Sequence, residues 1–298
     1  MLKSAGKKEP RSIEAKFMAA ALYKGAATTT KSRMKSTFNA LFVHCKRGRY
    51  GEVSPSTLSE KQFIRFVESR IAAGITPRAI QNETSHIRRA LIGARRADFA
   101  KKMSNAALGV PSGTRIGSGR ATDEAVLASA LERAAPDTRV WIELERYLGL
   151  RQTEVIESHK SIQQWEKAIA RGDRFVDVRE GTKGGRPRQV FIPDQHRERV
   201  LSAVRAGLAV LETRQYMVDA TTEQAAKQQM QDRFAALGLR GGDAGHSLRR
   251  AFAKDQFEHY MAEGYERRQA LSLVSRDMGH GDGRGRWVWN NYLKGSYE

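Results

Sequence analysis

The chain has 298 residues, 40% of them hydrophobic and 29% charged, which is typical of a globular protein with about two domains. No stretch approaches the roughly 18 consecutive apolar residues of a transmembrane helix. The basic start MLKSAGKKEP is not followed by an apolar segment, so we expect no secretory signal peptide. The single Cys45 excludes an internal disulfide and a cysteine-rich zinc site. These features predict an intracellular protein without a membrane partner.

The net charge of +19 is concentrated in the first part of the chain. Residues 1–120 hold 24 Lys and Arg against 7 Asp and Glu, a net charge of +17, which leaves +2 for the remainder. Such a segment attracts polyanions, and nucleic acid is the most common polyanion inside cells. A solvated basic surface is the alternative. A membrane-surface helix fits less well, because the basic residues are spread over several helix-like segments.

The first 108 residues predict a helical domain after a polar, basic tail at residues 1–11. We expect helices at residues 12–24 and 30–50, a third between Ser59 and Gly74, and a fourth that opens at Thr76-Pro77. Apolar residues recur at helical spacing in these segments, so residues 12–108 are expected to form a compact four-helix unit with cationic faces. Arginines on the fourth segment and just after it are expected to contact DNA: Arg78, Arg88, Arg89, Arg95 and Arg96.

Residues 109–121 contain four glycines, a proline and two arginines, the composition of a linker. Beyond this linker we expect a second domain at residues 122–298. It begins with helices at 122–135 and 138–148, separated by Pro136. Strands at 175–178 and 189–192 flank a glycine-rich tip and predict a β-hairpin. The predicted fold class is therefore mainly α with a small β-hairpin, built from a helical domain and a mixed α/β domain.

Two candidate functional residues lie in turns of the second domain. Arg151 follows Leu148-Gly149-Leu150, so its guanidinium stands at a helix junction, with Glu154 three residues on. A surface Arg–Glu pair would give the same pattern. Lys183 lies in the hairpin tip, Gly181-Thr-Lys-Gly-Gly-Arg-Pro-Arg188, from which an ammonium can reach into a groove. A solvated turn whose basic residues, Arg186 and Arg188 included, contact DNA phosphates is the alternative.

The last part of the chain adds two histidines, an arginine and a tyrosine. His246 and Arg249 are three residues apart at the start of a helix, so both side chains can contact one ligand. His280 lies in Met278-Gly-His-Gly, and Tyr292 follows in an aromatic cluster. Arginines can hold a phosphate, a phenol can attack phosphorus, and His and Lys can transfer protons. The histidines lack metal-binding spacing, so no metal or other cofactor is expected.

In this order the residues resemble the tyrosine recombinase family, the phage-type integrases. Members carry Gly-Leu-Arg-x-x-Glu, a β-hairpin Lys, His-x-Leu-Arg, Gly-His and a C-terminal Tyr. Here these motifs are Gly149-Leu150-Arg151 with Glu154, Lys183, His246-Ser247-Leu248-Arg249, Gly279-His280 and Tyr292. The resemblance covers residues 122–292, and residues 30–105 are similar to the family's helical core-binding domain in size, charge and helix count. Arg250 departs from the pattern, since many members have a second histidine there, and the long interval after His280 leaves Tyr297 as an alternative nucleophile.

The resemblance implies a role for each of these residues. Arg151 and Arg249 would hold the scissile phosphate, and Tyr292 would attack it to give a 3′-phosphotyrosyl intermediate. Lys183 would protonate the leaving 5′-oxygen. His246 would act as acid and base on the tyrosine, and His280 would donate a hydrogen bond to the phosphate.

The implied partners are two double-stranded DNA sites, bound by a homotetramer with possible accessory DNA-bending proteins in a bacterial nucleoid. Two other functions share part of this pattern. A type IB topoisomerase-like relaxer has the same cleavage chemistry, and a decayed recombinase would bind DNA without cutting it. The presence of all six candidate catalytic residues favours an active recombinase.

Overall fold

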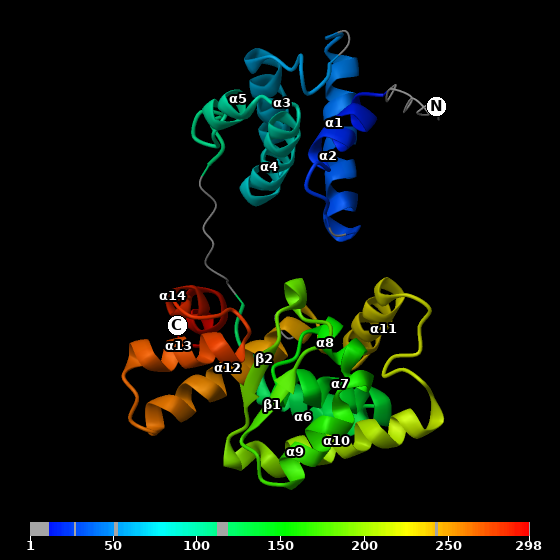
Figure 1. Ribbon diagram of the computed structural model, residues 1–298, viewed down its shortest axis with the longest axis vertical. Helices are drawn as coiled ribbons and strands as arrows, with labels where there is room; N and C mark the ends of the chain where they lie inside the picture. Colours follow the sequence, from blue (N-terminus) through cyan, green and yellow to red (C-terminus); the bar gives the residue numbers. More distant parts are fainter. Residues whose placement is uncertain (1–11, 27, 51–52, 112–118, 242–243, 298) are drawn as a thin grey trace, which may run out of the picture. The chain divides into compact units, whose positions relative to one another are not determined.

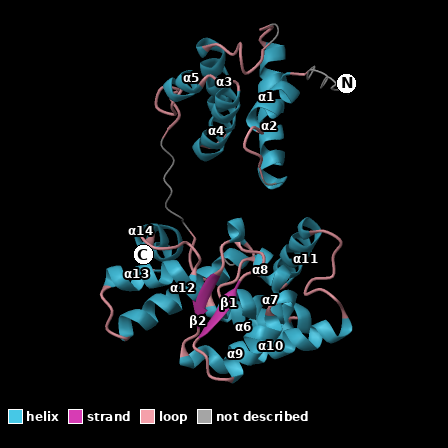
Figure 2. Ribbon diagram, in the orientation of Figure 1, coloured by secondary structure: helices cyan, strands magenta, loops and turns pink. Residues whose placement is uncertain are grey.

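The computed structural model describes residues 12–26, 28–50, 53–111, 119–241 and 244–297 (Figure 1). The predicted tail at residues 1–11 and residues 112–118 of the predicted linker lie outside the described residues. The chain divides into two compact units, Met1–Thr114 and Arg115–Glu298, called here the N-terminal unit and the C-terminal unit. Figure 2 shows helices in both units and strands in the C-terminal unit alone. The predicted fold class, mainly α with a small hairpin, is confirmed.

The N-terminal unit consists of five helices in its described residues, one more than predicted. They are α1 (Ile13–Ala21), α2 (Thr28–Arg47), α3 (Glu60–Ala72), α4 (Pro77–Gly93) and the short α5 (Ala97–Lys102). Ser59 caps α3 through a capping box with Gln62, and the Thr76 side chain caps α4. The apolar faces meet in one core whose fully buried members include Phe17, Phe38, Leu41, Phe63, Phe66, Ile87 and Leu91.

In the C-terminal unit the described helices pack around a second core. In chain order these are α6 (Glu124–Arg133), α7 (Pro136–Tyr147), α8 (Gln152–Ile156), η1 (Glu157–Lys160), α9 (Ile162–Ala170), η2 (Lys183–Gly185), α10 (Asp194–Thr213), α11 (Glu223–Ala236), α12 (Gly245–Ala262), α13 (Arg267–Asp277), α14 (Gly285–Val288), η4 (Trp289–Leu293) and η5 (Lys294–Ser296). α7 is buried along most of its length, and its Trp141 is fully enclosed. Pro136 begins α7 instead of merely separating two helices, because proline is favoured in the first turn.

The hairpin pairs β1 (Phe175–Val178) with β2 (Arg188–Phe191) in antiparallel register, Phe175 opposite Phe191. β2 begins and ends one residue earlier than the strand expected from the sequence. The shift places Arg188 inside the strand with its side chain buried. The hairpin therefore carries a cation into the interior of the unit, where it meets the residues described next.

Candidate active site

The buried carboxylate of Glu154 organises the cationic residues of the C-terminal unit. Its side chain is fully buried and accepts hydrogen bonds from Arg151 Nη1 at 2.6 Å and from Arg188 Nη2 at 2.8 Å, while Arg249 Nη1 lies 3.9 Å from Oε2. Burial opposes ionisation, yet the guanidiniums of Arg188 and its neighbours prevail and lower the pKa of Glu154 to about 2. One negative charge thus holds three guanidiniums at neutral pH.

Glu154 also fixes the start of α8. The backbone N–H of Arg151 donates to Glu154 Oε2 at 2.8 Å, which satisfies a donor that the helix end leaves free. This contact places Arg151 at the first turn of α8, at the junction that the sequence predicts, and the carboxylate fixes both its backbone and its side chain.

The guanidiniums of Arg151 and Arg249 converge on one atom, the main-chain oxygen of Met278. Arg151 Nη2 donates to it at 3.1 Å and Arg249 Nη2 at 2.5 Å. Arg151 comes from the α7–α8 junction, Arg249 from α12 and Met278 from the end of α13. Three distant segments therefore meet at a point where two cations share an acceptor, as they would share a phosphate.

Arg249 is almost completely buried but incompletely paired. It is 1% exposed, and its Nε and Nη1 have no hydrogen-bond partner. Burial, together with the nearby Arg188 guanidinium, lowers the pKa of Arg249 to about 10, so the group is charged at neutral pH. A buried cation with free N–H groups requires an anionic acceptor, since leaving such donors unpaired is costly.

Tyr292 lies in η4, with its ring 4% exposed and surrounded by other rings. The ring centroid of His246 is 5.3 Å away, that of His280 5.6 Å and that of Trp287 5.7 Å. His280 Nε2 is 3.4 Å from the phenolic oxygen, whereas no hydrogen bond joins His246 to it. His280 is therefore the histidine that hydrogen-bonds the hydroxyl, although the resemblance assigned proton transfer on the tyrosine to His246.

Both histidines are neutral at physiological pH. Burial, followed by the guanidiniums of Arg249 and Arg151, lowers the pKa of His280 to about 3. The ring of His246 keeps an exposed edge, but the protein atoms around it and the guanidiniums of Arg250 and Arg249 lower its pKa to about 4. A neutral imidazole has a lone pair with which to accept a proton, so either ring can accept one, but the lowered pKa makes each a weak base.

A cavity of about 450 Å³ opens onto this cluster. Arg151, His246 and Arg249 line it on one side, and Lys227 and Gln231 of α11 on the other. The first residues of α12 also reach its wall, so the positive end of that helix faces the cavity. Its charge and the free donors of Arg249 suit a phosphate group.

Lys183 is not part of this cluster. It lies exposed at the hairpin tip and, among the described residues, makes no hydrogen bond or ion pair. Tyr297, the alternative nucleophile, donates to Glu258 Oε1 at 3.0 Å and stacks on Trp289. The structure thus brings together five of the six candidate catalytic residues and leaves the sixth on a glycine-rich turn.

Four arginines that the sequence assigned to DNA also bond to acceptors within the protein. Arg88 bonds to Met103 O and Asn105, Arg89 to Ala21 O and Gly25 O, and Arg96 to Pro55 O and Leu58 O. Arg188 is buried against Glu154 and donates through Nε to Asp277 O at 2.8 Å. Each guanidinium satisfies protein acceptors that come from other segments, and contact of these four residues with DNA stays a prediction. Arg78, Arg95 and Arg186 remain exposed.

We expect Arg96→Gln and Arg78→Gln to have opposite effects. Losing the two carbonyl contacts of Arg96 and its position 4.1 Å over the Phe99 ring should lower the free energy of unfolding by about 2 kcal/mol. The salt dependence of duplex DNA binding should not change. Removing the exposed Arg78 charge should leave stability intact and reduce the salt slope by about 1. Urea unfolding and binding titrations over a range of salt concentrations measure both; the reverse pattern would contradict the assignment.

Two residues that sequence analysis did not assign also belong to this region. Glu145, on α7, is buried in the cavity wall, and Met278 contributes its main-chain oxygen. Glu145 stands in the charged stretch Glu143-Leu-Glu-Arg146, so nothing in the sequence indicated a buried carboxyl group there. No sequence signal exists for a backbone carbonyl.

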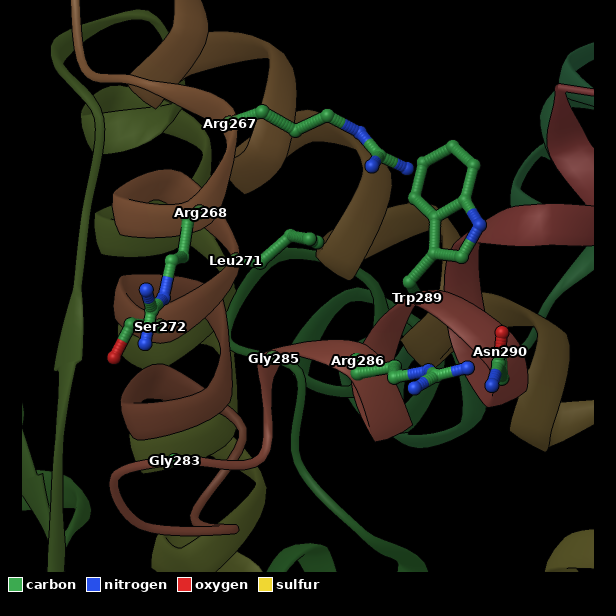
Figure 3. A pocket seen from close by; sticks show the side chains of 9 residues that line it. All are labelled: Arg267, Arg268, Leu271, Ser272, Gly283, Gly285, Arg286, Trp289 and Asn290. Atoms are coloured by element: carbon green, nitrogen blue, oxygen red, sulfur yellow. The ribbon is translucent and has the colours of Figure 1, made fainter.

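A second cavity, about 830 Å³, does not contain the clustered residues (Figure 3). It lies between α13 and the segment that runs from α14 into η4, where the guanidinium of Arg267 sits 4.1 Å from the Trp289 ring. Arg268 and Arg286 also line it. Neither cavity has metal-binding chemistry: in the described ranges, no group of three or more His, Cys, Asp or Glu side chains could hold an ion. Among the same residues, no helix is long and apolar enough to cross a bilayer.

Comparisons with known proteins agree with this geometry. Residues 109–255 match the family model described as Integrase. The fold is similar to lambda integrase in a dimer bound to a COC′ core site, with a TM-score of 0.59 and 15% identity over 95% of this chain and 76% of that chain. It is also similar to the Tn1549 transposon integrase in complex with transposon right end DNA, with a TM-score of 0.57 and 11% identity over 92% of each chain.

At these identities the likeness to solved structures shows the fold alone. A comparison with curated proteins finds no match. The matched residues contain Arg151, Lys183, His246 and Arg249, so the family model and the site overlap. Residues 109–255 are therefore similar to the integrase family, and the chain has the fold of the solved integrases.

Proposed function

We propose that this protein is a site-specific DNA recombinase that cleaves and rejoins DNA through a 3′-phosphotyrosyl intermediate formed by Tyr292. The observation that carries the proposal is the meeting of the Arg151 and Arg249 guanidiniums at Met278 O, in the site that also holds the Tyr292 phenol. A phosphate that displaced this carbonyl would be held by both cations next to an attacking oxygen.

In the proposed reaction the phenolic oxygen forms a bond to phosphorus while the bond from phosphorus to the 5′-oxygen breaks. The phenolic proton passes to a neutral imidazole, and His280 is the ring that hydrogen-bonds the phenolic oxygen. The two guanidiniums stabilise the charge that develops on the non-bridging oxygens. Attack by a 5′-hydroxyl then reverses these steps and releases Tyr292, so the energy of the broken bond is retained and no nucleotide cofactor is required.

The leaving 5′-oxygen needs a proton, and Lys183 is the residue that we propose for this step. Its position on a turn with three glycines allows the hairpin tip to change conformation when DNA binds. A lysine ammonium is a suitable acid because its pKa responds strongly to its surroundings.

We propose that the N-terminal unit binds the same DNA through exposed basic residues. Arg78 and Arg95 belong to this set, and α2 adds Lys31, Arg33, Lys35, Lys46 and Arg47, which sequence analysis did not assign. Lambda integrase forms a tetramer on a Holliday junction, and we propose the same homotetrameric arrangement on two DNA sites here, in the nucleoid of a bacterium and with accessory DNA-bending proteins.

A nicked duplex carrying the protein's own attachment sequence tests the proposal. After cleavage the short strand beyond the nick diffuses away, so a covalent complex accumulates. We expect a complex that survives denaturant, and mass spectrometry of its peptides should locate the nucleotide on Tyr292. DNA binding without any complex would instead identify a non-cleaving DNA-binding protein. Relaxation of supercoiled DNA that lacks the attachment sequence would favour the topoisomerase-like alternative.

A further inference from the structure

Glu145 is a buried carboxyl group in the wall of the catalytic cavity. It comes from α7, is 2% exposed, and its Oε1 has no hydrogen-bond partner. The group lies against the first turn of α12: a Cβ on Gly245 would be 2.8 Å from Glu145 Oε2. The cavity that Glu145 lines is the one lined by Arg151, His246 and Arg249.

The charged groups around Glu145 come from three other elements. α12 supplies Arg249 and His246, the α8 segment supplies Arg151 and Glu154, and α11 supplies Lys227. Glu145 and Arg249 both line this cavity, and Oε1 of Glu145 and Nε and Nη1 of Arg249 are buried without a hydrogen-bond partner. Three buried polar atoms without a partner, on two residues of one cavity, indicate a ligand with several hydrogen-bonding oxygens.

We propose that Glu145 is a phosphate-binding residue, which in its un-ionised form donates a hydrogen bond to a non-bridging oxygen of the phosphate that Arg249 holds. This inference rests on the proposed function, since it names a further contact to the same phosphate. A carboxylic acid with one proton is both donor and acceptor, whereas a carboxylate can only accept and would repel the anion.

Burial supplies the condition that this role requires. Desolvation raises the pKa of Glu145 well above its ordinary value, against the opposing effect of the Arg249 guanidinium and with a smaller contribution from the Glu154 carboxylate. Phosphate affinity therefore depends on the protonated form: it is highest below the raised pKa and falls as the pH increases through it. His246 and His280, with pKa values of about 4 and about 3, are neutral throughout a neutral to alkaline range and do not contribute.

The test is the binding of dimethyl phosphate to the full chain at increasing pH, followed by phosphorus NMR. This diester carries one negative charge over the whole range, so its own ionisation does not interfere. As the pH rises through the raised pKa of Glu145, we expect wild-type affinity to fall about tenfold. Glu145→Gln keeps a neutral donor of the same size, so it should bind at the acidic wild-type level with no such decline. Glu145→Leu should bind about tenfold more weakly and independently of pH.

Glu143→Gln is the matched control. Glu143 is a second buried carboxyl group on α7 whose pKa is also raised by burial, but it pairs with Arg139 at 3.2 Å and does not line the cavity. This variant should reproduce the wild-type pH profile. An unchanged pH profile in Glu145→Gln, or wild-type affinity in Glu145→Leu, would overturn the inference.

The covalent-complex assay tests the proposed cleavage reaction independently of the role of Glu145 in phosphate binding. A complex that forms on DNA while dimethyl phosphate binding lacks the pH dependence would refute the role of Glu145 alone. The expected pH dependence without any covalent complex would support the role of Glu145 in phosphate binding and refute the cleavage reaction.

Discussion

Phenylalanine in place of Tyr292 is expected to abolish the covalent protein–DNA complex while DNA binding stays at the wild-type level. The Tyr292 ring is buried among His246, His280 and Trp287, and phenylalanine keeps those contacts. The substitution removes one hydroxyl, whose contact in the structure is His280 Nε2 at 3.4 Å. The loss of activity should therefore be complete, because the only group lost is the proposed nucleophile.

Tyr297→Phe is the control for this experiment. Its hydroxyl is bonded to Glu258, and its ring stacks on Trp289, so its removal should leave the complex intact. Gel electrophoresis under denaturing conditions on the nicked attachment duplex measures the complex, and a mobility shift measures binding. A complex that persists in Tyr292→Phe and disappears in Tyr297→Phe would assign the nucleophile to Tyr297.

Removing the charge of Glu154 is expected to lower the free energy of unfolding by about 3 to 5 kcal/mol and to abolish cleavage. In Glu154→Gln the guanidiniums of Arg151, Arg188 and Arg249 remain together in a buried site without an anion between them. The amide N–H group that replaces a carboxylate oxygen would also face the N–H donors of these guanidiniums. Arg151 and Arg249, the two arginines proposed to hold the phosphate, both contact this carboxylate, so their positions should be lost together with the stability.

In the wild-type protein, the contribution of the Glu154 ion pairs should appear as a loss of stability at acidic pH. Glu154 has a pKa of about 2 in the folded chain and an ordinary value of 4.5. A lowered pKa means that the stabilisation is fully present above about pH 4.5 and is lost as the pH falls through 2. The difference corresponds to about 3 kcal/mol. In Glu154→Gln this part of the acid dependence should be absent.

Urea unfolding at several acidic pH values measures both effects. Glu157→Gln is a matched control, since Glu157 follows in the same segment but forms a solvent-exposed pair with Lys160. Exposed pairs contribute little, so this variant should change the free energy of unfolding by less than about 0.5 kcal/mol. Equal losses in both variants would show that Glu154 does not have the central role that its contacts indicate.

Local sequence patterns were sufficient to locate most helices and the hairpin. Ser59 and Thr76 cap the helices that they were expected to begin, and the strand pair lies within one residue of its predicted position. The reason is that caps, apolar periodicity and turn glycines act over a few residues. The residues of the site were also recognisable, because their types and order follow a family pattern.

The sequence did not show which arginines are exposed and which bond to acceptors within the protein. Arg78 and Arg96 have the same side chain in similar basic surroundings, yet one is exposed and the other is bound to carbonyls near residue 55. What distinguishes them is the presence of an acceptor from a distant segment, which depends on tertiary packing. The Met278 oxygen at which two guanidiniums meet is hidden for the same reason, because every residue type carries a backbone carbonyl.

The hairpin tip is anchored at both ends beside the buried carboxylate. At one end a Cβ on Gly181 would lie 2.3 Å from Thr153 O, so the turn packs against the backbone of α8. At the other end the guanidinium of Arg188 donates a hydrogen bond to Glu154. Only the six residues 182–187 between these anchors are free to rearrange. A proton donor at Lys183 would consequently travel on a short, doubly tethered loop, so that lengthening this loop should slow departure of the leaving strand without loosening the hold on the phosphate.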